Sequence, residues 1–185
     1  MESVPLSAAS PSGSDDASPE LRALFAQHHP KLMGYARNLM RRQPAGHTLQ
    51  PTALVNEVFL RLSSYIGPFD DYGHFLRLAA RTMRHVLIDH HRGKRATNRP
   101  GTCVDIELVS IAMPYEERAI DLAALDELLN DLAKEDSEAA QIVELRFFGG
   151  ATLNEVADTL GLAARTVDRR WKAIKLLLHS RLSDA

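Results

Sequence analysis

The segment that most constrains the fold lies near the C-terminus and reads TLNEVADTLGLAARTVDRRWKAIKLLL (152–178). Thr152 can cap a helix, because Glu155 follows at the reciprocal position of a capping box. Gly161 then supplies a left-handed turn residue, and a second helix begins after Ala163 or Ala164. Apolar residues recur at helical spacing on both sides of the turn: Leu153, Val156, Ala157, Leu160, Val167, Trp171, Ile174 and Leu178. This pattern predicts a helix-turn-helix.

The second helix of such a motif lies in the major groove of DNA, with its first residues at the base edges. Arginine can bind guanine in a bidentate manner, and lysine can hold a phosphate. The predicted DNA contacts are Arg165, Thr166, Arg169, Arg170 and Lys172. The alternative interpretation is a structural helical hairpin whose basic face is merely solvated.

The rest of the chain also shows helical periodicity, so the predicted fold class is all-α. Helices are expected from Pro19 to about residue 40, from near Pro51, and from about His74 to Gly93; Pro30 should bend or break the first. We predict two small helical domains joined by a linker. The expected divisions are a disordered tail (1–18), a first domain (19–97), a linker (98–118) and a second domain (119–185).

The formal net charge of −2 conceals an uneven distribution. Residues 81–99 carry six basic side chains against one acid, and so do residues 165–181. Residues 105–138 between them carry eleven acids and two bases, and residues 1–20 carry four acids and no base. Two basic blocks on separate helices predict two contacts with nucleic acid.

Several classes of protein are disfavoured by the sequence. No run of roughly 18 apolar residues and no signal peptide is present, so we expect a cytoplasmic protein without a membrane span. Cys103 is the lone cysteine, which excludes an intrachain disulfide and a thiolate zinc cluster. The HExxH motif is absent, and His85, His90 and His91 have poor spacing for one metal. We expect no enzyme, no metal and no cofactor.

Three segments in this order resemble a bacterial sigma factor of the sigma-70 family, of the group IV or extracytoplasmic-function (ECF) type. TALVNEVFLRL (52–62) resembles region 2.2, and HFLRLAARTMRHVLIDHHRGKR (74–95) resembles regions 2.3 and 2.4. The segment 140–182 resembles region 4. The resemblance covers about residues 20–183. It implies an alternative sigma factor, monomeric when unbound, that binds promoter DNA and core RNA polymerase through the β′ clamp helices and the β subunit.

The resemblance also implies a role for each set of residues. The five DNA contacts of the helix-turn-helix would read the −35 element. The −10 element would be read by Arg81, Arg84, Asp89, His90, Arg92, Lys94 and Arg95. Core polymerase would be bound by Leu54, Asn56, Glu57, Phe59 and Arg61. Tyr72, Phe75 and His90 could stack on unpaired bases or belong to the core. A stand-alone helix-turn-helix regulator is the competing hypothesis.

The chain departs from this family at one place. Many such sigma factors carry an acidic cluster before region 2.2, where this chain has Gln50, Pro51, Thr52 and Ala53. Core binding could depend on the remaining region 2.2 residues alone. Alternatively, a Ser/Thr kinase could phosphorylate Thr52 and restore negative charge at the first turn of the helix. The sequence predicts this modification as a switch.

Overall fold

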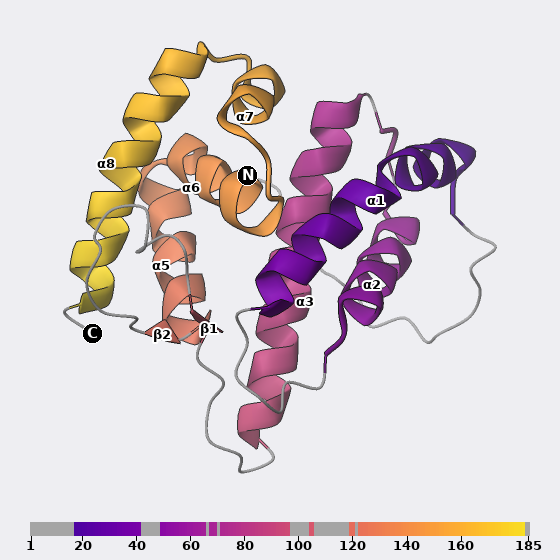
Figure 1. Ribbon diagram of the computed structural model, residues 1–185, viewed down its shortest axis with the longest axis horizontal. Helices are drawn as coiled ribbons and strands as arrows, with labels where there is room; N and C mark the ends of the chain where they lie inside the picture. The colour runs from indigo at the N-terminus through magenta and orange to yellow at the C-terminus, as the bar shows by residue number, and fades with distance from the viewer. Residues whose placement is uncertain are drawn as a thin grey trace.

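The computed structural model describes residues 17–41, 49–65, 67–69, 71–96, 104–105, 119–120 and 122–183. Over these ranges the chain is almost entirely helical, which confirms the predicted all-α class (Figure 1). The predicted disordered tail lies outside the described residues except for Ala17 and Ser18, and so does most of the predicted linker.

Three helices form the N-terminal part: α1 (Pro19–Arg41), α2 (Pro51–Ser63) and α3 (Tyr72–Ala96). Pro30 lies inside α1, which continues through it as one helix and does not break. α3 begins two residues before the predicted start, because the Asp71 side chain accepts a hydrogen bond from the backbone N–H of His74 at 2.7 Å. The three helices pack α1 on α2 and α2 on α3, and are called the N-terminal helices below.

The C-terminal helices are α5 (Leu122–Glu135), α6 (Ser137–Val143), the π-helical turn η1 (Glu144–Phe148), α7 (Leu153–Leu160) and α8 (Ala164–Ser183). The predicted capping box is confirmed, since Thr152 Oγ1 accepts from the Glu155 N–H and Glu155 Oε2 accepts from the Thr152 N–H. Gly161 has a φ of 66°, the left-handed conformation expected of the turn. The buried apolar faces of α7 and α8 then set the angle between them.

A short antiparallel strand pair was not predicted from the sequence. β1 (Val104–Asp105) pairs with β2 (Ala119–Ile120), with Val104 opposite Ile120. The two strands span two residues each and do not alter the fold class.

The N-terminal and C-terminal helices pack directly against one another. α3 is the N-terminal helix that lies against the C-terminal helices, where it contacts α5, η1 and α7 (Figure 1). Gly150 permits part of this approach, because it has a φ of 58° and a Cβ there would lie 2.2 Å from a ring carbon of Tyr35 on α1. Tyr35 is half-buried at this contact, and its burial together with the nearby charge of Glu155 on α7 raises its pKa to about 12. The chain therefore forms one packed body across the two predicted domains.

No helix in the described ranges has the length and apolar content that crossing a membrane requires. The same ranges contain no group of three His, Cys, Asp or Glu side chains placed to hold a metal ion.

Candidate nucleic-acid interface

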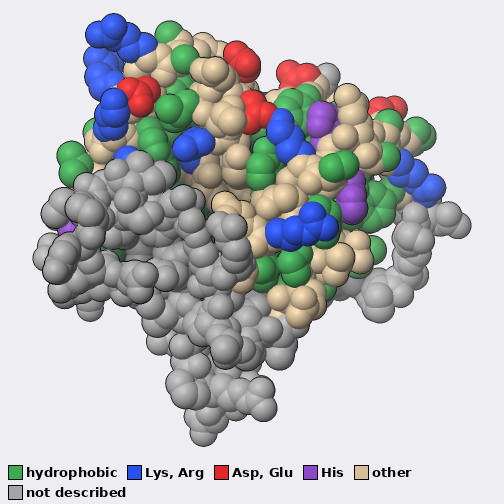
Figure 2. Space-filling view, in the orientation of Figure 1, with side chains coloured by type: hydrophobic (Ala, Val, Ile, Leu, Met, Phe, Trp, Pro, Cys, Tyr) green, Lys and Arg blue, Asp and Glu red, His purple; other side chains and the backbone are tan. Residues whose placement is uncertain are grey.

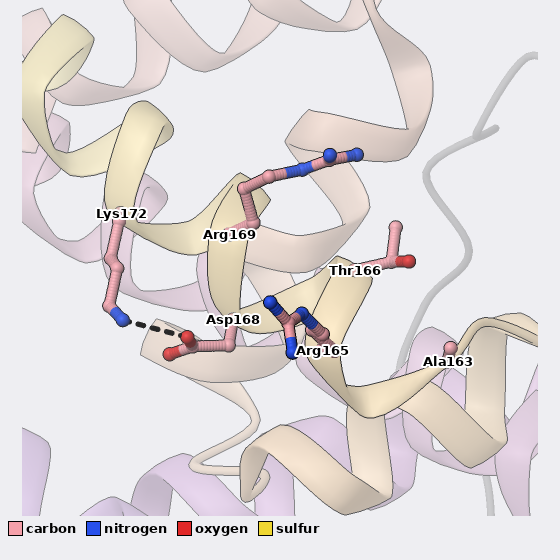
Figure 3. Close-up of a pocket in the computed structure, with 6 residues that line it drawn as sticks. All are labelled: Ala163, Arg165, Thr166, Asp168, Arg169 and Lys172. Carbon is pink, nitrogen blue, oxygen red and sulfur yellow. Dashed lines mark hydrogen bonds and ion pairs between the residues drawn. The ribbon is translucent and has the colours of Figure 1, made fainter.

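The first turns of α8 carry a basic surface hollow of about 580 Å³ (Figure 3). Its lining is Ala163, Arg165, Thr166, Asp168, Arg169 and Lys172. Val167 and Trp171 on the opposite side of the helix are buried, and this anchors the helix with its basic face outward. The amphipathic pattern of the sequence thus places these side chains at the surface.

Arg165 and Arg169 are both exposed, and within the described ranges neither has an ion-pair partner. Lys172 forms a surface ion pair with Asp168 at 2.7 Å, and its side chain remains 68% exposed. Such a pair contributes little stability, so a phosphate can displace the carboxylate. Figure 2 shows Lys and Arg side chains gathered over the corner of the molecule where α8 begins. This corner has the charge and the donor groups that DNA requires.

Arg170 differs from the other predicted contacts of this helix. Its guanidinium pairs with Asp136 at 2.7 Å and also with Glu138, at the start of α6. Asp136 simultaneously caps α6 by accepting from the Ala139 N–H. Arg170 therefore holds α8 against the corner between α5 and α6. This corrects the prediction from the sequence that Arg170 contacts DNA.

The basic block of α3 divides into exposed and engaged side chains. Arg81 is exposed, and His90 is half-buried. Arg92 is exposed but pairs with Asp126 on α5 at 3.1 Å. The side chains of Lys94 and Arg95, which were also predicted to contact DNA, lie outside the described set.

Arg84 does not lie on the exposed side of α3, which corrects its assignment to the −10 surface. It is 3% exposed and pairs with Asp126 and Glu144, both at 2.7 Å. The helical periodicity of the sequence indicates this burial, since Arg84 lies on the same side of α3 as the buried residues Ala80 and Leu87. A charged residue on a buried stripe needs a partner, and here the C-terminal helices supply it.

Two candidate stacking residues are engaged within the protein. Phe75 is fully buried in the core, so it is not a platform for bases in this arrangement. Tyr72 is half-buried and stacks on His28 with ring centroids 4.1 Å apart. Burial and the neighbouring charge of Lys31 lower the pKa of His28.

The exposed face of α2 differs from the predicted polymerase-binding set. Leu54 is fully buried and belongs to the core, which corrects its assignment, and Phe59 is half-buried against Phe25 at 4.9 Å between centroids. Asn56 is exposed as expected. Leu60 is 49% exposed on the same face, although it was not among the residues predicted from the sequence. Its position outside the buried stripe of the helix, beside Asn56, could have indicated it.

Arg61 connects the predicted polymerase surface to the predicted −10 surface. Its Nε donates to Glu57 on its own helix at 3.0 Å, and Nη1 donates to Asp89 on α3 at 2.9 Å. Burial lowers the pKa of Arg61, but the two carboxylates outweigh it and raise the pKa overall. The three side chains form one charged link between α2 and α3.

Comparison with known proteins bears on these surfaces. The sequence model described as "ECF sigma factor" matches residues 6–184. This chain belongs to the ECF sigma factor family. It is similar to the protein named ECF RNA polymerase sigma factor SigL in three strains of Mycobacterium tuberculosis, with 29% identity over 166 residues. That alignment covers 86% of this chain and 89% of the relative.

As an ECF sigma factor the chain is an alternative transcription initiation factor of a class that binds core RNA polymerase and promoter DNA. The match extends over the N-terminal helices as well as the helix-turn-helix. This extent favours a sigma factor over a stand-alone helix-turn-helix regulator, because such a regulator requires only the second half of the match.

In this sigma factor α2 begins without a carboxylate. Pro51 occupies the first turn, no acidic residue lies in that turn, and the N-cap residue Gln50 makes no side-chain hydrogen bond to the backbone. Thr52 is exposed at this helix start. The positive end of the helix dipole is therefore left without a negative side chain, in contrast to α7, where Glu155 lies in the first turn.

Proposed function

We propose that this sigma factor reads the −35 element with the start of α8 and docks on the β′ clamp through the exposed face of α2. The basic hollow at Arg165, Thr166, Arg169 and Lys172 supports the first assignment, because exposed arginine donors at a helix start match base edges in the major groove. Asn56 and Leu60 on the exposed side of α2 support the second.

The exposed residues of α3 would then face the −10 element. Arg81 and His90 are the candidates that are accessible in the packed chain, and Asp89 is exposed while paired with Arg61. Lys94 and Arg95 complete the proposed set. Their charges would follow the DNA backbone while the strands separate.

We further propose that phosphorylation of Thr52 by a Ser/Thr kinase activates docking. The observation that carries this proposal is the exposed threonine in a first turn that has no carboxylate and no side-chain cap. A phosphate brings about −1.5 to −2 charges and three acceptor oxygens. At this helix start it would meet unsatisfied backbone N–H groups, and its remaining oxygens would face a basic partner.

The test compares core binding and promoter-dependent transcription for unmodified chain, kinase-treated chain, Thr52→Ala and Thr52→Glu. Close interfacial charge pairs contribute ~1.5–7 kcal/mol, so modification should tighten core binding at least tenfold. Thr52→Glu should recover part of this gain. Ser64→Ala is the matched control, because Ser64 is an exposed hydroxyl residue at the opposite end of α2. Two results would each rule out the switch. One is activity of Thr52→Ala equal to that of the kinase-treated original chain, and the other is no gain in activity when the original chain is treated with the kinase.

A further inference from the structure

The basic hollow at the start of α8 contains an acidic side chain. Asp168 lines the hollow together with Arg165, Arg169 and Lys172, and it is the one acid among the described residues of the lining. Arg165 precedes Asp168 by three residues and Lys172 follows it by four, so the three side chains lie on one face of the helix. The face that is proposed to meet DNA therefore carries a negative charge among its positive charges.

The carboxylate of Asp168 is accessible within this surface. Its side chain is 41% exposed, and the neighbouring Val167 is buried, which fixes the side of the helix that faces outward. The Lys172 Nζ donates to Asp168 Oδ2 at 2.7 Å, whereas Oδ1 has no hydrogen-bond partner in the described part of the chain. Figure 3 shows Arg169 and Thr166 pointing away from this pair. An acceptor oxygen is therefore available at the surface of the hollow.

A carboxylate at this place does not serve the DNA backbone, because it repels phosphates and weakens binding to every sequence. The ion pair with Lys172 does not require it for stability either, since an exposed pair four residues apart on one helix contributes little. The major groove does contain hydrogen-bond donors, namely the N4 amino group of cytosine and the N6 amino group of adenine. An aspartate on a helix that enters this groove is thus suited to choosing between bases.

We propose that Asp168 is a specificity-determining residue, whose carboxylate accepts from the N4 amino group of one cytosine in the −35 element. The inference rests on the proposed function of α8 as the helix that reads this element. Cytosine offers the carboxylate a donor, whereas adenine places the acceptor N7 beside its N6 donor. Guanine and thymine would place acceptors against a negative charge that has lost its water. One position of the element should therefore favour cytosine and reject guanine and thymine.

Lys172 links this choice of base to a contact with the backbone. In the unbound chain its ammonium pairs with Asp168. On DNA the ammonium can turn to a phosphate, since its side chain is 68% exposed. Asp168 then exchanges the lysine for the cytosine amino group. Where another base occupies the position, the carboxylate keeps Lys172 as its partner, so the wrong base costs a phosphate contact as well as a base contact.

Base selection by the complex of the full chain with core polymerase tests this assignment. A promoter is first found by transcribing fragmented genomic DNA, its −35 segment is randomised, and the transcribed templates are sequenced. One position should be enriched in cytosine by about tenfold over guanine and thymine. Asp168→Asn should move this preference to adenine, because asparagine binds adenine N6 and N7, and Asp168→Ala should abolish it. Templates compete within one pool, so a variant of lower overall activity still reports its preference.

Asp131→Asn is the matched control. Asp131 on α5 pairs with Lys134 of its own helix at 2.8 Å, so this variant removes the same charge from a similar exposed pair outside the hollow. Its base preferences should equal those of the unmodified chain, and the same change in both aspartate variants would count against the proposal. Unchanged preferences in Asp168→Asn and Asp168→Ala would overturn it, even if both bind all templates more tightly, because the carboxylate would then be only a partner of Lys172.

Salt dependence tests the exchange of partners. Two promoters that differ only by cytosine or guanine at the selected position are titrated with the complex at several salt concentrations. The slope of log affinity against log salt should be steeper by about 1 for the cytosine promoter, because Lys172 reaches a phosphate only there. Lys172→Ala should remove the difference. Equal slopes for the unmodified chain would refute the exchange.

Two arginine variants separate this inference from the proposed function. Arg165→Ala and Arg169→Ala are put through the same selection from the randomised pool. If neither changes the preference at any −35 position, α8 does not read the element and the proposed function has failed. If the arginine variants change preferences and the Asp168 variants do not, only the assignment of Asp168 is refuted.

Discussion

The basic faces of α8 and α3 are equivalent in sequence and different in structure. Each block has six basic side chains and one acid. At the start of α8, Arg165 and Arg169 are exposed, whereas on α3 Arg84 is buried and Arg92 is paired. The difference teaches that a count of positive charge locates candidate helices, while the long-range carboxylates decide which side chains are accessible to DNA.

The largest expected effect is on stability, and it separates the two faces. Arg84→Ala leaves the buried Asp126 and the half-buried Glu144 without their main partner, so the free energy of unfolding should fall by ~3–5 kcal/mol. Arg165→Ala removes an exposed side chain and should change it by about 0.5 kcal/mol or less. Urea denaturation followed by circular dichroism measures both. Equal losses would abolish the contrast between the faces.

The next effect is on promoter recognition and belongs to α8. Arg169→Ala should weaken binding of the sigma factor and core enzyme complex to its promoter by ~1–3 kcal/mol, the contribution of a bidentate contact with a base. Core binding should be unchanged. Quantitative footprinting and a core-binding titration measure the two quantities. A parallel loss of core binding would mean that α8 has been assigned to the wrong partner.

A smaller effect is expected within the α3 face itself. Arg92 shares Asp126 with Arg84, but its side chain is 58% exposed. Arg92→Ala should therefore lower the free energy of unfolding by ~1 kcal/mol or less, as for other exposed ion pairs. The same denaturation assay applies. A loss as large as that of Arg84→Ala would show that the exposure of an arginine does not determine how much stability its ion pair contributes.

The smallest effect is on the pH dependence of stability. Burial, with the charges of Arg81 and Arg84, lowers the pKa of His85 below its ordinary value of 6.5, although Glu144 and Asp126 oppose this. The unfolded chain then binds a proton more readily, so stability is lost as pH falls through 6.5 toward the folded pKa. Thermal melts at pH 7.5 and about 5.5 should show this, with a shallower dependence for His85→Gln. An unchanged dependence would contradict it.

Local features of the sequence predicted local structure well. The capping box at Thr152 and Glu155, the left-handed Gly161 and the buried stripe through Val167 and Trp171 all follow from spacings of a few residues. The start of α8 at Ala164 follows as well. These features depend on helix geometry alone and not on distant partners.

Long-range pairing was beyond the reach of the same reasoning. Arg84 and Asp126 are 42 residues apart, and no spacing rule connects them. Leu54 was assigned to polymerase although it shares the buried stripe with Val58, and Leu60 was overlooked. In each case the side of the helix was readable from its period. The partner of Arg84, however, depended on how the N-terminal and C-terminal helices meet.

The close approach at Gly150 has a consequence for how this chain can vary. Tyr35 occupies the space where a Cβ would lie, so any side chain at position 150 would act as a wedge between α1 and the C-terminal helices. A single substitution at this position would thus push α1 away from the C-terminal helices without altering a charge. Position 150 is therefore a point at which natural variation or protein engineering would loosen the contact between the N-terminal and C-terminal helices.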